Sequence, residues 1–560
     1  MGRANGPVKE VAVATVSSLL ADHVSLRVAS VDRLGIAGYI PKLAYEGGLV
    51  KFLLHRAAQA KYAVNIPSPA LLGHNHDRMV AELERFVAQR DLPVVRFKAG
   101  EVKELIARPY QLAAAASGRE GFVLLGKAQE RQMAWAGYKD QKSKLATASH
   151  PHFSFSRQSR VPDQWYFYLW DHQWGPAFLK LSAYAPYPLW LSANGHEWAK
   201  RQLAIAGVGF AELDNGLWRV DDPEAAHRIC ARLSAGHVGD LIRRWLPQLP
   251  GPLTAADRAA GFDWAFSIRQ MEISDTSVFD RPQVGRAWFE AAIKDHLDLG
   301  RPDKIRLVFD RQIITAGKHP TPGRFATQVV TRGTHPHIDA RYKSSKVKAY
   351  FKEQRALRVE TTINNPADFG IQKTLNPANW RALRHTGTAI NGRFLQALGE
   401  GNGTVPDDQW LRDVVMPSVH DGQRAPGLRF GEPRVAALLE ALCSTGHIFD
   451  GLTNATLRSH MSALLGVDYR ASQATYDLRR LRLKGLIERI AHSNRYRITD
   501  HGRRVATLFT RLTKHVVIPA LAALRDTSRP GRRTPPPLAA AWRNYDREIK
   551  RLLKRSRLAA

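Results

Sequence analysis

The sequence predicts a mixed α/β and α+β fold with three parts: an N-terminal α/β unit, a central aromatic-rich antiparallel β region and a C-terminal module of helices with a two-stranded hairpin. Three observations support this. Apolar strands alternate with helical segments over the first 130 residues, aromatic strand-like runs fill residues 150–220, and helical apolar spacing returns after residue 430. At roughly 100–200 residues per domain, the 560 residues correspond to about three or four domains.

The composition is that of a globular chain with a large excess of cations. It is 44% hydrophobic and 24% charged, and 82 Lys+Arg against 51 Asp+Glu give a net charge of +31. Such an excess favours a polyanionic partner, nucleic acid first, although a genome that favours arginine codons is the alternative cause. We find no apolar run of about 18 residues and no convincing signal peptide, so we expect a cytoplasmic, nucleoid-associated protein without a membrane partner.

The charge is concentrated towards the C-terminus. Residues 430–560 carry 25 Lys+Arg and 10 Asp+Glu, net +15, whereas residues 1–429 carry 57 and 41, net +16. The two cysteines lie far apart and without a partnering motif, which excludes a disulfide framework and a four-cysteine zinc site.

The sequence predicts five segments. They are an α/β domain (1–149), a mixed β-rich domain with helices (150–300), a β-meander with helices (301–420), a winged helix-turn-helix (430–526) and a basic tail helix (527–560).

The assignment of the fourth segment rests on its order of elements. RVAALLEALCS has helical spacing, Thr453 is placed to cap a second helix that stops at Gly466, and Ser472 is placed to cap a third helix with one cationic face. LIERI, a short turn and RYRIT then form a hairpin, and Asp500 opens a last helix. This is the order of a winged helix-turn-helix.

The stretch YDLRRLRLKGLIERIAHSNRYRITDHGRRVA resembles winged-helix regulators of the MarR and related types over about 75 residues. The resemblance implies that the third helix enters the major groove of DNA while the wing contacts the backbone or minor groove. The implied contact residues are Gln473, Thr475, Tyr476, Arg479 and Arg480 on the helix and Asn494 and Arg495 on the wing. A protein-interaction module is the alternative.

In the N-terminal unit, charged residues follow the predicted strands LPVVRF and GFVLLG. Lys98, Glu101, Lys103 and Glu130 lie there, and ligands of open α/β sheets gather beyond the carboxyl ends of strands. Ordinary solvated loop charges are the alternative for these four positions.

Acidic residues also end several later strands. Asp171 and Asp214 each end an apolar strand, and Asp310 follows KIRLVF. Carboxylates at strand ends are how metal-dependent nucleases of several folds hold Mg²⁺ against phosphate. We therefore predict catalytic roles for these three residues and for Glu130, with Asp171 and Asp214 as metal ligands.

The segment from GRFATQVVTRG to KSSKVKAYFKEQRALRVETTIN predicts an antiparallel meander in which Arg358 and Glu360 share one face. Lys346 lies among the lysines just upstream. A carboxylate beside cations suits metal-assisted phosphodiester chemistry, so Glu360 is a further predicted metal ligand and Lys346 a catalytic candidate. The structural alternative is that Glu360 pairs with Arg358 or a lysine.

The motifs HPHFSFSRQ, NGHEW, LDNG, LGRPDKIRLVFDR and VETTIN resemble a family of large bacterial proteins without a characterised activity. This resemblance extends over most of residues 25–400 and implies that the body and the C-terminal module form one recurrent unit. We find no Walker A, dinucleotide-binding, His-Glu-x-x-His or Gly-x-Ser-x-Gly motif, which disfavours the corresponding chemistries.

Three functional hypotheses remain. The first is a DNA-acting, Mg²⁺-dependent nuclease or strand-transferase of a mobile-element, replication or defence system. The second is a non-enzymatic winged-helix regulator or replication initiator whose body senses a ligand or forms a homo-oligomer. The third is an RNA-binding or RNA-guided protein, in which the basic body and the aromatic strands would contact the RNA.

Overall fold

The computed structural model describes residues 23–60, 66–139, 152–299, 326–332, 335–399, 408–420, 422–444, 447, 451–518, 544, 547–548 and 551. The chain separates into two compact units, one built mainly from residues up to 402 and the other from residues after it. None of the helices in the described stretches is long and apolar enough to cross a membrane.

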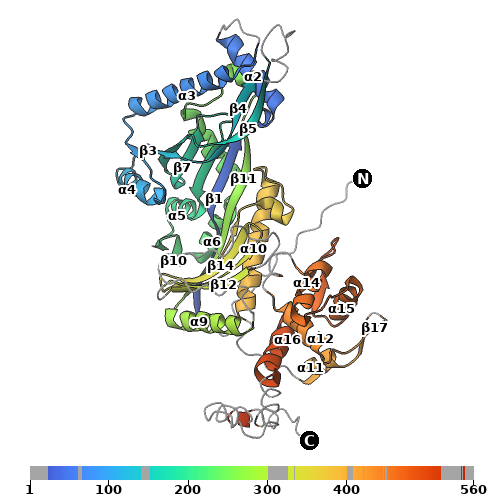
Figure 1. The fold of residues 1–560 in the computed structure, drawn as a ribbon. Helices are drawn as coiled ribbons and strands as arrows, with labels where there is room; N and C mark the ends of the chain where they lie inside the picture. Colours follow the sequence, from blue (N-terminus) through green and yellow to red (C-terminus); the bar gives the residue numbers. More distant parts are fainter. Residues whose placement is uncertain are drawn as a thin grey trace, which may run out of the picture. The chain divides into compact units, whose positions relative to one another are not determined.

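An eleven-stranded sheet organises the first unit, in the order β12-β13-β14-β15-β11-β1-β8-β7-β6-β3-β2 (Figure 1). Its strands are β1 (Val24–Tyr39), β2 (Val94–Arg96), β3 (Gly121–Gln129), β6 (Asp163–Asp171), β7 (Gly175–Ser182), β8 (Leu189–Asn194), β11 (Ala265–Phe279), β12 (Ala326–Arg332), β13 (His335–Tyr342), β14 (Ser345–Lys352) and β15 (Ala356–Ile363). Strands from all three predicted body segments, 1–149, 150–300 and 301–420, belong to this one sheet.

The sheet is almost entirely antiparallel. Only β2 and β3 pair in parallel among the described strands, so the predicted N-terminal α/β unit contributes a single parallel pair. The predicted meander is confirmed, because β12 to β15 pair in sequence, each antiparallel to the next. The short distances between these strands along the chain made that pairing visible in the sequence.

The first strand of the sheet is long. Residues 30–39 have a local helical pattern in the sequence, but they continue β1 between β11 and β8. Pairing on both sides outweighs the local helical pattern of this stretch. The register with β11 shifts between Val31 and Leu34, so Asp32 and Arg33 lie in a β-bulge.

Alternate side chains of the sheet pack under different helices. On β6, Trp165 and Phe167 belong to the core packed by α3 (Pro69–Gln89), whereas Tyr166 belongs to a core on the opposite face with residues of α4 (Lys103–Ala116). At the other end of the sheet, residues of α10 (Pro377–Gly399) join a core with alternate residues of β14 and β15. The intervening residues of β14 and β15 face away from that core.

The remaining elements of the first unit surround the sheet. They are α2 (Glu46–Gln59), α5 (Gly195–Ile205), α6 (Pro223–Arg232), α7 (Ala235–Trp245), α8 (Ala255–Ala259), α9 (Pro282–Leu299), the hairpin β4 (Gln132–Lys139) and β5 (Phe153–Arg160), the hairpin β9 (Phe210–Leu213) and β10 (Gly216–Val220), and the 3₁₀ turns Pro41–Ala44, Leu246–Gln248 and Pro366–Phe369.

The second unit contains the predicted order of helices and hairpin around its own apolar core. Its elements are α11 (Asp408–Val415), β16 (Ser418–His420), β17 (Gln423–Ala425), α12 (Pro433–Leu442), α14 (Asn454–Leu465), α15 (Ala471–Leu483), β18 (Ile487–Arg489), β19 (Tyr496–Ile498), α16 (Asp500–Arg511) and the π-helical turn Leu512–Val517. Thr453 caps α14 and Gly466 ends it with a positive φ, as predicted, but the N-cap of α15 is Arg470 rather than Ser472. Nearly all of the predicted tail helix, 527–560, lies outside the described residues.

Candidate functional site

Three carboxylates meet on adjacent strands of the large sheet. Asp32 on β1, Glu272 on β11 and Glu360 on β15 each offer an oxygen, and these atoms lie within 4.8 Å of one another. We call these three residues the acidic cluster. Hard cations such as Mg²⁺ and Mn²⁺ prefer carboxylate oxygen ligands, so the cluster has the donor set of a divalent cation site.

Strand register assembles the polar surroundings of the cluster. Ser30 lies opposite Ser274, Ser274 opposite Glu360, and Glu360 opposite Lys348. Side chains directly opposite each other in neighbouring strands project from the same face, so this row crosses four strands on one face. The bulge in β1 aims Asp32 towards the same row, because a bulge redirects the side chain of its extra residue.

Arg358 is the central cation of this face. Its side chain is fully buried, and its guanidinium donates to Asp32 and, from Nε at 3.1 Å, to Oε2 of Glu360. It also donates to the carbonyl oxygen of Asn215 in the β9–β10 turn. Two of the three carboxylates are therefore already paired, as the structural alternative for Glu360 anticipated.

His196 holds the other side of Asp32. The ring is buried, and its Nε2 lies 2.8 Å from Oδ1 of Asp32 and 2.9 Å from Oγ of Ser30. Burial lowers the pKa of His196, against the opposing charge of Asp32, so the ring is neutral and Nε2 carries the proton donated to Asp32. Asn194 caps α5 through the backbone N–H groups of His196 and Glu197, which fixes this position.

The electrostatic balance leaves one carboxylate without a cation. Burial raises the pKa of Asp32, but Arg358 and His196 outweigh it and lower the pKa to about 2. Burial, reinforced by Glu360 and Asp32, raises the pKa of Glu272 to about 7. When Glu272 is ionised, its carboxylate thus carries the negative charge of the cluster that no cation pairs with.

The carboxylate oxygens differ in how far they are used. Both oxygens of Asp32 accept hydrogen bonds, from Ser30, Ser274 and Arg358. Oε2 of Glu272 accepts from Oγ1 of Thr362 at 3.1 Å. Oε1 of Glu272 accepts no hydrogen bond from any described residue, and Oε1 of Glu360 has only Lys348, with Nζ 3.8 Å away. These two oxygens are the ones that the hydrogen-bond network leaves available to a cation.

Two further side chains border Glu360. Tyr350 donates from its hydroxyl to Oε2 of Glu360 at 3.1 Å, and Lys348 lies over the Tyr350 ring at 4.1 Å. Burial lowers the pKa of Lys348, against the opposing effect of Glu360. Lys346, the predicted catalytic lysine, follows the same face of β14 but lies opposite Thr362 rather than Glu360.

Glu130 lies in a separate group. Its carboxylate accepts from Lys103 and Tyr166, and from Nζ of Lys180 at 3.0 Å. Burial raises the pKa of Glu130, but these three donors outweigh it and lower the pKa to about 2. The residue lies next to β3, six strands from β15 in the sheet order, so it does not join the acidic cluster.

The other predicted carboxylates do not converge either. Buried Asp171 accepts from the backbone of Gln173 and Trp174, and from Nε1 of Trp245, so it closes the β6–β7 turn and anchors α7. Asp214 is exposed in the β9–β10 turn, with Arg108 at 3.4 Å. The acidic cluster therefore includes Glu360 but neither of these two predicted ligands, because Asp171 is engaged in its turn and Asp214 pairs with Arg108. Asp310 lies outside the described residues.

Sequence reasoning missed Asp32, Glu272 and His196. Glu272 and Ser274 alternate with Met271 and Ile273, which is a strand pattern with one polar face, and this signal was available. Asp32 lies in a bulge of β1, and His196 lies at the N-terminus of α5. Pairing between strands that are distant in sequence brings the two together, and no local pattern in the sequence predicts this.

In the second unit, the exposed side chains of α15 form a stripe at helical spacing. Gln473 is half-buried and accepts from the backbone of Arg470, while Thr475 is exposed and accepts from Nδ2 of Asn454 at 2.9 Å. The exposed members of the stripe are Ser472, Thr475, Tyr476, Arg479 and Arg482. On the hairpin, Asn494 is exposed and Arg495 is half-buried.

Arg480 differs from the prediction. Its side chain is buried, and its guanidinium donates to the carbonyl oxygens of Pro426 and Gly427. Lys484 similarly donates to Asp413 and Met416. These two cations hold the segment before α12 against α15, so Arg482 rather than Arg480 completes the exposed cationic face.

Comparisons with protein families, with curated proteins and with solved structures found no match for this chain.

We predict that Arg358→Met lowers the free energy of unfolding of the first unit by about 3–5 kcal/mol, because it leaves a buried Asp32 unpaired. Tryptophan fluorescence during urea unfolding measures this, since most tryptophans lie in the first unit. Combining Arg358→Met with Asp32→Asn should recover part of the loss. A single variant within about 1 kcal/mol of the wild type would contradict a structural role for the pair.

Glu272 gives a pH-dependent prediction. Its pKa is 4.5 in the unfolded chain and about 7 when folded, so the folded state binds the proton more tightly and stability is lost as the pH rises from about 4.5 through 7. In the presence of a chelator, Glu272→Gln should gain stability over the wild type between pH 5 and 8, by on the order of 1–3 kcal/mol. Thermal unfolding of the wild type and of Glu272→Gln at pH 5 and at pH 8 measures this. A stability difference between the two proteins that is the same at both pH values would contradict the prediction.

Proposed function

We propose that the chain is a metal-dependent enzyme that cleaves or transfers phosphodiester bonds in nucleic acid, with its centre at the acidic cluster. The observation that carries this proposal is that Asp32, Glu272 and Glu360 offer oxygens within 4.8 Å of one another, beside the half-buried Lys348. Glu272 and Glu360 are the ligands, through their Oε1 atoms, and Asp32 adds negative charge while it holds Arg358 in place.

The chemistry follows from the charges around the ligands. A bound Mg²⁺ or Mn²⁺ would polarise a phosphoryl oxygen. Lys348 lies beside Glu360, where a cation offsets charge that develops on the phosphate. Tyr350 donates to Oε2 of Glu360, which leaves Oε1 available to a metal ion. The neutral His196 and the two serines orient Asp32 and take no part in the reaction.

The substrate class follows from charge and from an aromatic side chain on the same face. The net charge of +31 favours a polyanion. Trp190 on β8 occupies the space over Gly35, where a Cβ would lie 2.3 Å from Cζ2 of the ring. Gly35 pairs with Gln270, two residues before Glu272, so the half-buried indole shares a face with the acidic cluster. Aromatic rings of this kind stack unpaired bases.

A non-enzymatic regulator or initiator is the second candidate function. It is favoured by the pairing of Arg358 with Asp32 and Glu360, because an acidic cluster neutralised internally needs no metal. The pKa of Glu272, raised to about 7 by burial and its acidic neighbours, favours the first candidate, because a cation would relieve that repulsion. An RNA-acting protein remains an outcome of the substrate test.

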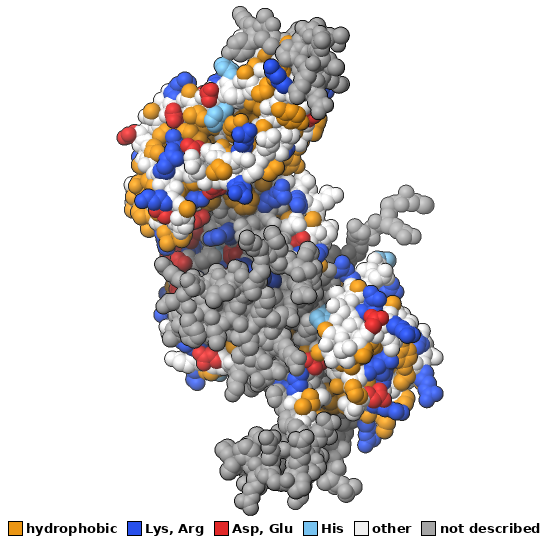
Figure 2. All heavy atoms as spheres, in the orientation of Figure 1, with side chains coloured by type: hydrophobic (Ala, Val, Ile, Leu, Met, Phe, Trp, Pro, Cys, Tyr) orange, Lys and Arg blue, Asp and Glu red, His pale blue; other side chains and the backbone are white. Residues whose placement is uncertain are grey.

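The C-terminal unit is the proposed DNA-binding part. Its order of helices, hairpin and last helix supports a winged helix-turn-helix, and α15 presents the exposed stripe of Thr475, Tyr476, Arg479 and Arg482. Lys and Arg side chains outnumber acidic ones on the visible face of this unit, around α15 and β17 (Figure 2). An exposed arginine on such a helix can contact phosphates or guanine edges.

The metal prediction uses Mn²⁺ as the ion. Saturating Mn²⁺, about 100-fold above its Kd, should stabilise the wild type by about 2.7 kcal/mol and support cleavage or strand transfer of single-stranded DNA or RNA. Glu272→Gln and Glu360→Gln should lose both effects. Asp214→Asn, a change at an exposed carboxylate outside the cluster, should keep both. Stabilisation without any reaction on DNA or RNA would contradict the enzyme and leave a metal-binding regulator.

For the C-terminal unit, Arg479→Ala and Arg482→Ala should each weaken duplex binding by about 1–3 kcal/mol if the arginine contacts a base, and lower the salt slope by about 1 if it contacts a phosphate. Arg429→Ala, which removes an exposed arginine outside α15 in the same unit, should leave both unchanged. Arg480→Ala should instead lower the melting temperature. Fluorescence anisotropy over a salt series measures binding; the DNA-binding assignment fails if Arg479→Ala matches Arg429→Ala.

A further inference from the structure

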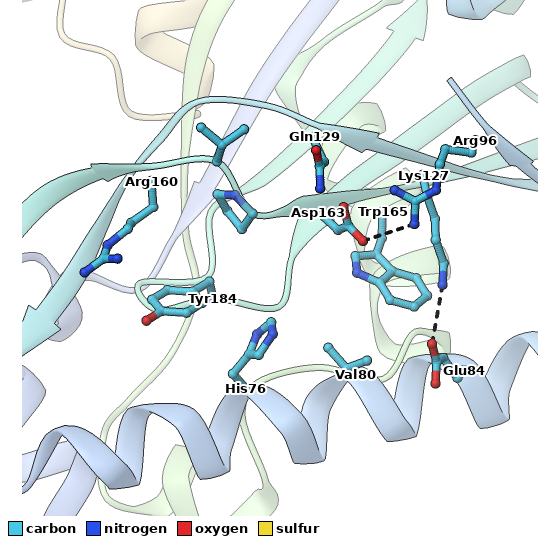
Figure 3. Close-up of a pocket in the computed structure, with 12 residues that line it drawn as sticks. His76, Val80, Glu84, Arg96, Lys127, Gln129, Arg160, Asp163, Trp165 and Tyr184 are labelled. Atoms are coloured by element: carbon cyan, nitrogen blue, oxygen red, sulfur yellow. Dashed lines mark hydrogen bonds and ion pairs between the residues drawn. The ribbon is translucent and has the colours of Figure 1, made fainter. Parts of the chain in front are cut away.

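A second polar site lies in the first unit, between α3 and the strands β3, β5 and β6. It is a pocket of about 490 Å³, within the range of about 300–1,000 Å³ that small-ligand sites occupy. Figure 3 shows His76, Val80 and Glu84 on α3 along one side, and Gln129, Asp163 and Trp165 from the strands along the other.

The pocket is separate from the acidic cluster. Trp165 belongs to the core packed by α3, whereas its neighbour Tyr166 faces α4. Strand pairing shows which residues share a face of the sheet. Tyr166 lies opposite Lys180, and Lys180 lies opposite Trp190. Tyr166 therefore lies on the face of Trp190 and the acidic cluster. Trp165 and the acidic cluster are therefore on opposite faces of the sheet.

The pocket has one cation in excess. Arg96 pairs with Asp163 at 3.5 Å, and Lys127 pairs with Glu84 at 3.5 Å. Arg160 is exposed and has no side-chain partner among the described residues. The third cation is therefore available to an anion that enters the pocket, and a guanidinium binds phosphate in a bidentate manner.

The other side chains suit a flat, polar ring. The His76 and Tyr184 rings lie 5.2 Å apart, at the same end of the pocket as Arg160 (Figure 3). Nδ1 of His76 lies 3.1 Å from the carbonyl oxygen of Ala183 and donates to it, which leaves Nε2 as an acceptor in the neutral ring. Gln129 points into the pocket, and its amide has no partner among the described residues.

We propose that this pocket binds a nucleoside phosphate, with the phosphate on Arg160 and the base against Tyr184 and His76. The Gln129 amide and Nε2 of His76 then offer donors and acceptors to the edge of the base. Inorganic phosphate alone would use Arg160 but would leave the rings and the amide without a partner. The nucleoside phosphate is either a free nucleotide or one residue of a single strand.

Titration calorimetry on the full chain, with a chelator present so that the acidic cluster holds no metal, tests the proposal. The ligands are AMP, adenosine and inorganic phosphate. AMP should bind at least about tenfold more tightly than either of the others, and Arg160→Ala and Gln129→Ala should each weaken AMP by about tenfold or more. Arg157→Ala removes an arginine on the same strand that lies over Trp135, outside the pocket, and should leave the AMP affinity unchanged.

A short oligothymidylate separates the two sources. If AMP competes with the oligonucleotide, and Arg160→Ala weakens both, the pocket takes a nucleotide within a strand; if only AMP depends on Arg160, it takes a free nucleotide. AMP that binds no better than phosphate, or equally to wild type and Arg160→Ala, overturns the proposal. Glu272→Gln should keep the AMP affinity, so failure of the proposed metal chemistry and failure of this site are distinguishable.

Discussion

A guanidinium with no exposed surface joins the strands that carry the acidic cluster. Arg358 on β15 pairs with Asp32 on β1 across the intervening strand β11, and it donates to Glu360 and to the β9–β10 turn. A buried charge is tolerated only when it is paired and hydrogen-bonded. The position of Asp32 in its bulge and the approach of the β9–β10 hairpin both depend on this one cation.

The same pairing decides what the cluster is able to do. Arg358 pairs with Asp32 and with one oxygen of Glu360. The negative charge that it does not pair with therefore lies on Glu272 and on the other oxygen of Glu360. Burial and the neighbouring carboxylates raise the pKa of Glu272 to about 7. A divalent cation at these oxygens would replace the proton and supply the charge that Arg358 does not. The buried ion pairs of Arg358 and the proposed metal site thus both follow from the way Arg358 pairs with Asp32 and Glu360.

Local patterns predicted the local parts of the fold. The meander of β12 to β15, the shared face of Arg358 and Glu360, the cap at Thr453 and the order of elements in the C-terminal unit all follow from short-range spacing. The acidic cluster did not, because its three members come from strands that are distant in sequence and adjacent in the sheet. Asp171 was misread because a carboxylate that closes a turn after a strand has the same sequence signature as a ligand at a strand end. Arg480 was misread because periodicity does not reveal which arginine a neighbouring loop will bury.

The most direct test is a crystal structure of the protein grown with Mn²⁺ and recorded at the manganese absorption edge. We predict an anomalous peak between Oε1 of Glu272 and Oε1 of Glu360, with ligand distances of about 2.0–2.3 Å, and no such peak in Glu272→Gln. A wild-type structure at saturating Mn²⁺ with no peak at these atoms, and with Arg358 still pairing both Asp32 and Glu360, would contradict it.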